Sequence, residues 1–243
     1  QLLNEVKEKT SRYRLELIEN NAQRLLNLVN QLLDLSKLEA GQMPLDLRLG
    51  NPATTVRMAA EQFQSLARQR DISWIVSIPE TPVQVVFDEN KLDKVISNLV
   101  SNALKFTDQG GAVNIKLTEK TSFDPFRKEF LLEVTDSGIG IASEDLPKVF
   151  DRFYQTAHTR GGTGIGLSLC KELVNQMGGS ISVESPVENG KGSRFLVAFP
   201  AALALEDSLS PTLMVDRPEL SGPLLYSLES PPQPPDQQPL LLL

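Results

Sequence analysis

Between residues 12 and 40, apolar side chains recur at alternating steps of three and four residues. Such spacing predicts one long amphipathic helix with the seam of a coiled coil or helical bundle. The seam comprises Leu15, Ile18, Ala22, Leu25, Val29 and Leu32. Leucines at 26, 28, 33, 35 and 38 widen the apolar stripe, so we expect the helix to pair with another helix or chain. It should end at Gly41, ahead of Pro44.

From residue 45 onward, short apolar runs replace the helical period. They predict strands at 45–49, 72–78, 83–87, 112–118, 130–135, 180–184 and 194–199. Helices are predicted from Pro52 to about Arg70, after Asp88, and from Gly164 to about Met177. Strands and helices do not alternate regularly. We therefore expect an α+β fold with a mixed sheet covered by helices on one face.

Composition narrows the class of protein. Hydrophobic residues make up 40% of the chain and charged residues 23%, which is typical of a globular protein. The net charge of −7 argues against non-specific nucleic-acid binding. Cys170 is the only cysteine, so no internal disulfide can form, and we expect a buried thiol in a cytoplasmic protein. No uninterrupted apolar run reaches the roughly 18 to 20 residues that span a bilayer.

The segment 98–106 carries the first candidate chemistry. Asn98, Asn102 and Lys105 are four and three residues apart, so they share one helix face. Mg²⁺ favours a few oxygen ligands together with water and substrate phosphates, which makes Asn102 the candidate metal ligand. Asn98 would assist it, and Lys105 would contact phosphate oxygens. A polar, solvent-facing side of an amphipathic helix explains the same residues.

Two further segments, 136–140 and 190–195, suit a nucleotide base. Asp136 ends an apolar strand and precedes Gly138 and Gly140. A carboxylate there can accept a hydrogen bond from the exocyclic amine of adenine, and the glycines let the backbone approach the base. An ordinary Asp-Gly turn is the alternative. Ser193 could hold a water near the base, and Phe106 could line the base or pack in the core.

The segment 161–167 places glycines directly before a predicted helix. Backbone amides at a helix N-terminus favour anionic phosphate, and glycines leave them unobstructed. Gly162, Gly164 and Gly166 do not follow the spacing of the dinucleotide-binding fingerprint, and no Gly-Lys-Ser/Thr of a P-loop follows them. Both of those rival nucleotide-binding folds are disfavoured.

In this order, the four segments resemble the N, G1, G2 and G3 boxes of the ATP-binding domain of sensor histidine kinases. Phe150–Tyr154 stands in the F-box position, and the resemblance covers residues 12–200. It implies a two-layer α/β sandwich of the Bergerat type, with ATP and Mg²⁺ bound. The implied ATP-binding residues are Asn98, Asn102, Lys105, Phe106, Asp136, Gly138, Gly140, Arg152, Gly162, Thr163, Gly164, Ile165, Gly166, Leu167 and Ser193.

The resemblance also divides the chain. Residues 24–41, RLLNLVNQLLDLSKLEAG, resemble the second helix of the dimerisation hairpin, so 1–43 would be a hairpin remnant and 44–200 the catalytic domain. A generic coiled-coil arm remains the alternative for that helix. Residues 201–243 are rich in proline and predict a linker. Its end, Pro239–Leu243, resembles the first strand of a receiver domain, or is a bare apolar tail.

Between Asp151 and Gly161 we expect a lid over the triphosphate, with Phe150 and Phe153 anchoring it to the core. Arg152 matches the basic residue of the F box, and Arg160 is a second cation in the lid. Gln155 stands where the family often has a second arginine, so phosphate contacts from that position are in doubt.

The resemblance favours phosphoryl transfer over hydrolysis. Related gyrase and MutL ATPases carry a glutamate as general base at the position of Asn98, which cannot accept a proton at neutral pH. In the histidine kinases the acceptor is a hairpin histidine. The only histidine, His158, lies in the lid, so we expect the chain to start after the acceptor and to donate phosphate in trans at best.

The expected protein is thus the catalytic portion of a hybrid-type sensor histidine kinase. Its expected partners are a second copy through the dimerisation helices, the phosphoacceptor helix, and a receiver domain or response regulator. A non-catalytic nucleotide-binding or dimerisation scaffold is the alternative. A serine kinase of the anti-sigma type is disfavoured by the long leucine-rich helix.

Overall fold

The computed structural model describes residues 2–80, 83–156, 162–187 and 190–203. It begins with α1, Leu2–Glu39, which is longer than the helix predicted over 12–40. Gly41 takes a positive φ of 64°, and the amide of Gln42 donates to the Lys37 carbonyl, as expected of a glycine after a helix end. Among the described residues, no helix is both long and apolar enough to cross a membrane.

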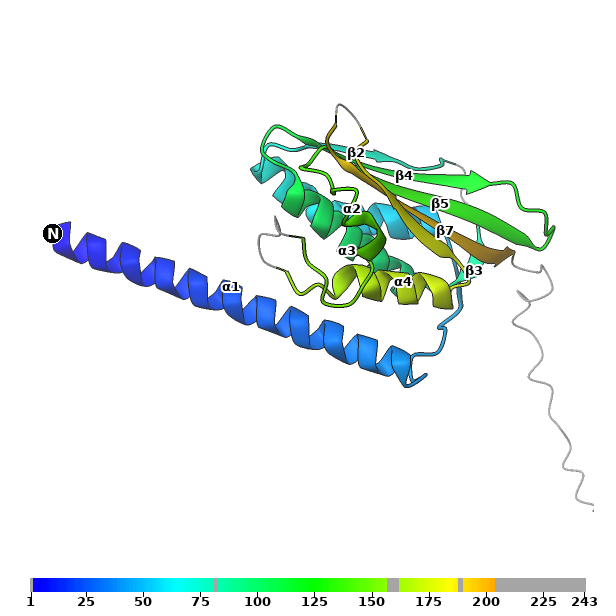
Figure 1. The fold of residues 1–243 in the computed structure, drawn as a ribbon, viewed down its shortest axis with the longest axis horizontal. Helices are drawn as coiled ribbons and strands as arrows, with labels where there is room; N and C mark the ends of the chain where they lie inside the picture. Colours follow the sequence, from blue (N-terminus) through cyan, green and yellow to red (C-terminus); the bar gives the residue numbers. More distant parts are fainter. Residues whose placement is uncertain (1, 81–82, 157–161, 188–189, 204–243) are drawn as a thin grey trace, which may run out of the picture. The chain divides into compact units, whose positions relative to one another are not determined.

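The described part of residues 48–203 contains a mixed sheet of seven strands, and Figure 1 shows it packed against helices. The strands are β1 (Arg48–Gly50), β2 (Ser73–Ser77), β3 (Val85–Phe87), β4 (Ala112–Lys120), β5 (Arg127–Asp136), β6 (Ser180–Glu184) and β7 (Ser193–Leu203). Their order is β1-β3-β7-β5-β4-β2, with β6 also paired to β7. Only β2 and β4 run parallel among these pairs.

Helices cover one face of the sheet, as predicted (Figure 1). They are α2 (Pro52–Gln69), α3 (Glu89–Phe106) and α4 (Gly166–Gln176); a short 3-10 helix spans Leu146–Lys148. Apolar side chains of these helices meet those of β4, β5 and β7 in one buried core. Cys170 lies in this core without solvent exposure, which confirms the expected buried thiol.

Local capping explains where two helices begin. The Asn51 side chain accepts from the amide of Ala53, and Pro52 fills the first helical position. The Asp88 side chain accepts from the amide of Lys91 at the start of α3. Both starts agree with the sequence prediction.

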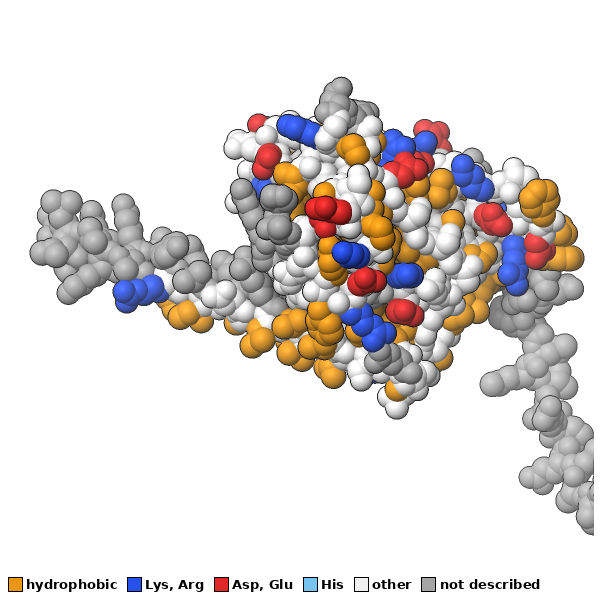
Figure 2. Space-filling model, in the orientation of Figure 1, with side chains coloured by type: hydrophobic (Ala, Val, Ile, Leu, Met, Phe, Trp, Pro, Cys, Tyr) orange, Lys and Arg blue, Asp and Glu red, His pale blue; other side chains and the backbone are white. Residues whose placement is uncertain are grey.

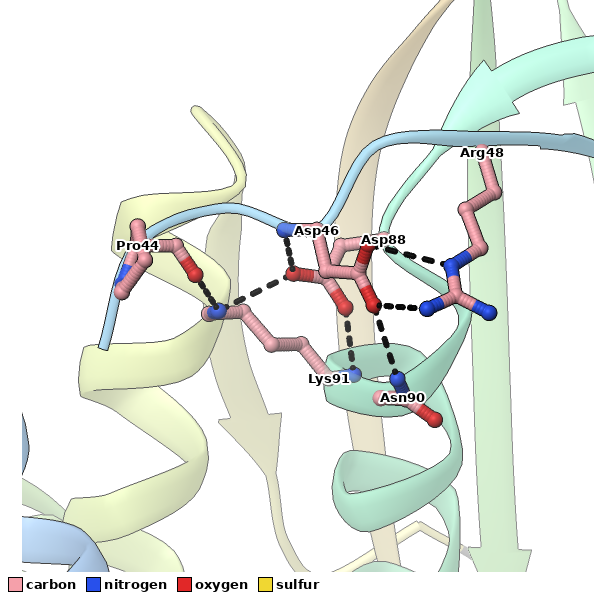
Figure 3. A network of polar contacts seen from close by, with 6 residues as sticks. All are labelled: Pro44, Asp46, Arg48, Asp88, Asn90 and Lys91. Atoms are coloured by element: carbon pink, nitrogen blue, oxygen red, sulfur yellow. Dashed lines mark hydrogen bonds and ion pairs between the residues drawn. The ribbon is translucent and has the colours of Figure 1, made fainter.

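The segment 45–49 departs from its prediction, because only Arg48–Gly50 pairs as a strand. Upstream of Arg48, backbone groups bond to the start of α3 instead: Pro44 accepts from Lys91 Nζ at 2.8 Å, and the Asp46 amide donates to Asp88 Oδ2 at 2.9 Å (Figure 3). The alternating leucines of this segment stay exposed, so alternation alone overstated the strand. Residues 201–203, expected in the linker, extend β7, and 204–243 lie outside the described residues.

Candidate nucleotide-binding site

Helix α3 presents the asparagines of the N box on the side away from the core. Leu99 and Ala103 are buried, while Asn98, Asn102 and Lys105 are half-buried along one edge. Asn102 makes no side-chain hydrogen bond to another described residue, so its amide oxygen is available to a ligand. Lys105 lies with its Nζ 4.7 Å from the centroid of the Phe106 ring. The predicted common face of the three polar residues is therefore present.

Asp136 is the buried acid of the site. Its side chain is at the end of β5 with 5% exposure, and it accepts from the Gly138 amide at 2.8 Å. Burial raises the pKa of Asp136 to about 6, although the backbone amides of Gly138 and Ser193 oppose the rise. A buried carboxyl with this pKa gains from a ligand that donates a hydrogen bond to it.

Glycines bring the G1 segment against its neighbours. A Cβ on Gly138 would lie 2.4 Å from the Phe106 carbonyl oxygen, and one on Gly192 would lie 2.3 Å from the Asp136 carbonyl oxygen. The Gly192 amide donates to the Gly138 carbonyl at 2.9 Å. The end of the N box and the G1 and G3 segments thus meet at one point, where only glycine fits.

Gly140 completes this part of the site through a residue that sequence reasoning missed. The Ser185 hydroxyl donates to the Gly192 carbonyl at 2.7 Å and accepts from the Ile141 amide at 2.8 Å. A Cβ on Gly140, whose φ is 75°, would lie 3.1 Å from Ser185 Oγ. Ser185 therefore connects the G1 and G3 segments, and nothing in its local sequence marks it.

The G2 segment starts helix α4 beside the N box. A Cβ on Gly166 would lie 2.8 Å from Asn98 Oδ1, so the first turn of α4 directly faces Asn98. Ile165 is fully buried, and Leu167 packs against the core. The Thr163 hydroxyl accepts from the Ile165 amide at 3.2 Å. Ile165 and Leu167 thus hold the segment in place against the core.

The F-box aromatics divide into one anchor and one exposed ring. Phe150 packs edge-on against Phe195 at 6.5 Å between centroids, as predicted. The predicted anchoring role of Phe153 is wrong: its ring is 63% exposed, and its backbone amide bonds to the Gly164 carbonyl instead. The φ of Phe153 is 62°, which turns its side chain away from the core.

Tyr154 of the F box and Gln155, which follows it, bond to other segments. The side-chain amide of Gln155 donates to the Gly162 carbonyl at 3.0 Å, so this position is held to the G2 segment. The Tyr154 hydroxyl donates to Asp145 at 2.6 Å. Arg152 is exposed. His158, Arg160 and Gly161 lie outside the described residues.

A glutamine of α1 also reaches the site, and the sequence prediction did not include it. Gln31 Nε2 donates to Asn98 Oδ1 at 3.3 Å, and Gln31 Oε1 accepts from the Thr163 hydroxyl at 2.7 Å. A sequence signal exists: Gln31 interrupts a run of leucines at 28, 35 and 38 along one helix face.

Known proteins are similar to this chain in sequence and in fold. Residues 87–203 match the family described as histidine kinase-, DNA gyrase B-, and HSP90-like ATPase. Hybrid signal transduction histidine kinase D of Dictyostelium discoideum is 38% identical over 80% of the chain, and sensor histidine kinase WalK of Bacillus subtilis is 35% identical over 78%. The chain spans 13% and 30% of the lengths of these relatives.

A solved structure shares the fold. Full-length ShkA in complex with AMPPNP is 28% identical and superimposes with a TM-score of 0.66, covering 79% of this chain and 39% of that one.

Proposed function

We propose that this chain, which carries a histidine-kinase catalytic domain with an ATP-binding role, binds Mg-ATP at the four boxes. The domain belongs to the family described as histidine kinase-, DNA gyrase B-, and HSP90-like ATPase. In the proposed reaction it donates the γ-phosphoryl group of ATP to a histidine. The observation that carries the proposal is that helix α3 meets two glycine segments: Asn98 faces Gly166, and the Phe106 carbonyl faces Gly138, whose amide donates to Asp136. Both the asparagine edge of α3 and the buried acid lie on the helix-covered side of the fold.

Asp136 binds the adenine end of the ligand. Its carboxylate accepts from the exocyclic amine of adenine, and guanine, which has a carbonyl at that position, cannot make the bond. Gly138 and Gly140 bring backbone to the base without a side chain between them, and Ser193, opposite Asp136 in the β5–β7 pairing, supports a water there. This arrangement supports selection of ATP over GTP.

Helix α3, the first turn of α4 and Arg152 bind the phosphate end of the ligand. Asn102 fits a single oxygen ligand for Mg²⁺, because its amide has no other partner among the described residues and Mg²⁺ takes its remaining ligands from phosphates and water. Mg²⁺, when bound, offsets charge on the phosphate oxygens. Asn98 and Lys105 flank Asn102 on the same edge, and the α4 amides following Gly164 favour the anionic groups.

The acceptor is a histidine side chain rather than water. Asn98 cannot take a proton from water at neutral pH, so the position has no general base for hydrolysis. A neutral imidazole nitrogen attacks the γ-phosphorus without such a base: a nitrogen–phosphorus bond forms, the bond to the bridging oxygen breaks, and ADP leaves. In the complete protein we propose a homodimer, a phosphoacceptor helix and a receiver aspartate as later partners.

Thermal unfolding with Mg-ATP and with Mg-GTP tests the nucleotide site. A ligand that binds only the folded state stabilises it by about 2.7 kcal/mol at a hundredfold excess over Kd. We expect a rise in Tm with Mg-ATP alone, weakened in Asn102→Ala and Asp136→Ala. If a folded wild-type chain gains no stability from any nucleotide, the kinase proposal fails and a dimerisation scaffold replaces it.

A further inference from the structure

Helix α1 has two apolar faces with different surroundings. The face made of Leu28, Gln31, Asp34, Leu35 and Leu38, called here the docking face, follows helical spacing. Leu35 is 4% exposed and Leu38 packs against the catalytic core. Elsewhere on α1, exposed leucines stand at 15, 25, 26, 32 and 33, and Figure 2 shows hydrophobic side chains gathered along this helix. The docking face therefore packs against the nucleotide-binding domain of the same chain.

Polar contacts of the docking face join the residues of the proposed phosphate site. Gln31 bonds to Asn98 and Thr163 at once, and Asp34 Oδ2 lies 2.5 Å from Lys94 Nζ. Asn98 Nδ2 donates to the Lys94 carbonyl at 2.9 Å, so both groups of the Asn98 amide are already engaged. One side chain of α1 thus uses the oxygen of Asn98 and the hydroxyl of Thr163.

We propose that Gln31 and the nucleotide compete for Asn98 and Thr163, so that α1 docks on the empty site and Mg-ATP releases it. The inference rests on the proposed function, because it takes these two residues as nucleotide contacts. Coupling between two binding events is reciprocal. If α1 docking lowers the affinity for the nucleotide by some factor, bound nucleotide lowers the equilibrium constant for α1 docking by the same factor.

The connection between α1 and the catalytic domain, residues 40–48, allows α1 to move while residues 44–48 stay in place. Lys91 and Asp88, 5% and 0% exposed, hold Pro44 and Asp46 to the start of α3 (Figure 3). Gly41, before this anchor, has a φ of 64°, and a Cβ built on it meets no atom within 4 Å. Rotation at residues 40–42 would change the direction of α1, while Met43, which packs against the core, and 44–48 stay fixed.

Affinity for Mg-ATP gives the direct test. We expect Gln31→Ala to bind a fluorescent ATP analogue about 5- to 20-fold more tightly than wild type, a range typical of coupled sites. Asp34→Ala should tighten binding in the same direction. Gln23→Ala is the matched control, because Gln23 is exposed on the same helix and bonds only to Asn27 among the described residues; its Kd should equal that of wild type.

Distance measurement tests the movement itself. Nitroxide labels at Ala22→Cys and Ser182→Cys, both exposed positions, would report the separation of α1 from β6. Buried Cys170 stays unlabelled. Labelled protein diluted with unlabelled protein keeps distances between copies out of the signal. We expect Mg-AMPPNP to shift or broaden the distance distribution, and Gln31→Ala to do so without nucleotide.

The outcomes separate the two proposals. Nucleotide binding with equal Kd in wild type and Gln31→Ala, and an unchanged distance distribution, would overturn the competition and leave the nucleotide site standing. Failure of a folded wild-type chain to bind any nucleotide would overturn the proposed function and, with it, this inference.

Discussion

At the scale of single residues, Asp136 determines how the site responds to pH. Its pKa, raised to about 6 by burial, means that the carboxyl takes up a proton just below neutrality. A protonated carboxyl is a weaker acceptor for the adenine amine than the carboxylate, because the negative charge is gone. We therefore expect the affinity for Mg-ATP, measured by titration from pH 5.5 to 7.5, to fall as the pH drops through about 6. Asp136→Asn should bind weakly at every pH; a wild-type affinity independent of pH would contradict this role.

The same residue weakens the empty fold at neutral pH. In the unfolded chain an aspartate ionises near pH ~3.9, whereas folded Asp136 ionises near 6. Between these values the folded chain binds more protons, so this contribution to stability is present at low pH and is lost as the pH rises through about 6. Asp136→Asn should therefore raise the free energy of unfolding at pH 7 by roughly 1 to 3 kcal/mol in urea melts. No gain, or a loss, would show that the carboxylate is better solvated than its burial implies.

Gly138 shows a requirement of a different kind, since its φ is not positive and space alone excludes a side chain. Gly138→Ala would place a Cβ 2.4 Å from the Phe106 carbonyl oxygen, and backbone cannot yield cheaply there. We expect a loss of Mg-ATP affinity of at least tenfold by titration. Gly190→Ala is the comparison: its φ of 76° carries backbone strain, but a Cβ meets no atom within 4 Å, so affinity should change little.

At the scale of elements, the start of α3 carries a buried ion pair that fixes residues 44–46, the segment between α1 and β1. Lys91 bonds to both Pro44 and Asp88 (Figure 3). Although burial raises the pKa of Asp88, hydrogen bonds from the Asp46 and Lys91 amides and from Lys91 Nζ, with its charge, outweigh this and lower it. Lys91→Met leaves a buried carboxylate unpaired, which costs about 3 to 5 kcal/mol of unfolding free energy in urea titrations.

Arg48→Met is the control within the same network. The Arg48 and Asp46 side chains of this ion pair are 67% and 45% exposed. Because water screens an exposed pair, the loss of stability should be much smaller than in Lys91→Met. Equal losses in the two variants would mean that burial does not determine the strength of this anchor.

Element boundaries that depend on caps were predictable, and those that depend on tertiary pairing were not. Asn51, Pro52 and Asp88 act locally, so the starts of α2 and α3 followed from sequence. The strand expected over 45–49 failed because Lys91 and Asp88, more than forty residues away, take up the backbone groups. Phe153 was misplaced for a similar reason, since its positive φ depends on a bond to Gly164.

At the scale of the whole molecule, the residue types and order of the four boxes predicted the family, whereas Ser185 and Gln31, which contact these segments, belong to no box. A single glutamine in a leucine stripe has many explanations until its contacts with Asn98 and Thr163 are known. The leucine pattern of α1 predicted one wide apolar surface. In the structure this surface consists of two faces, the docking face and an exposed face.

The exposed face of α1 gives the last prediction. Leu25, Val29 and Leu32 keep seam spacing and remain more than a third exposed in the single chain; such a stripe is buried by pairing with another helix. We expect wild type to associate with rising concentration in sedimentation experiments, and Leu25→Glu with Leu32→Glu to stay monomeric. Gln23→Glu, which adds charge without removing apolar area, should still associate. Because Leu25 and Leu32 lie outside the docking face, the monomeric variant should keep the wild-type Kd for Mg-ATP. A monomer that no longer bound nucleotide would show that the two faces of α1 do not act separately.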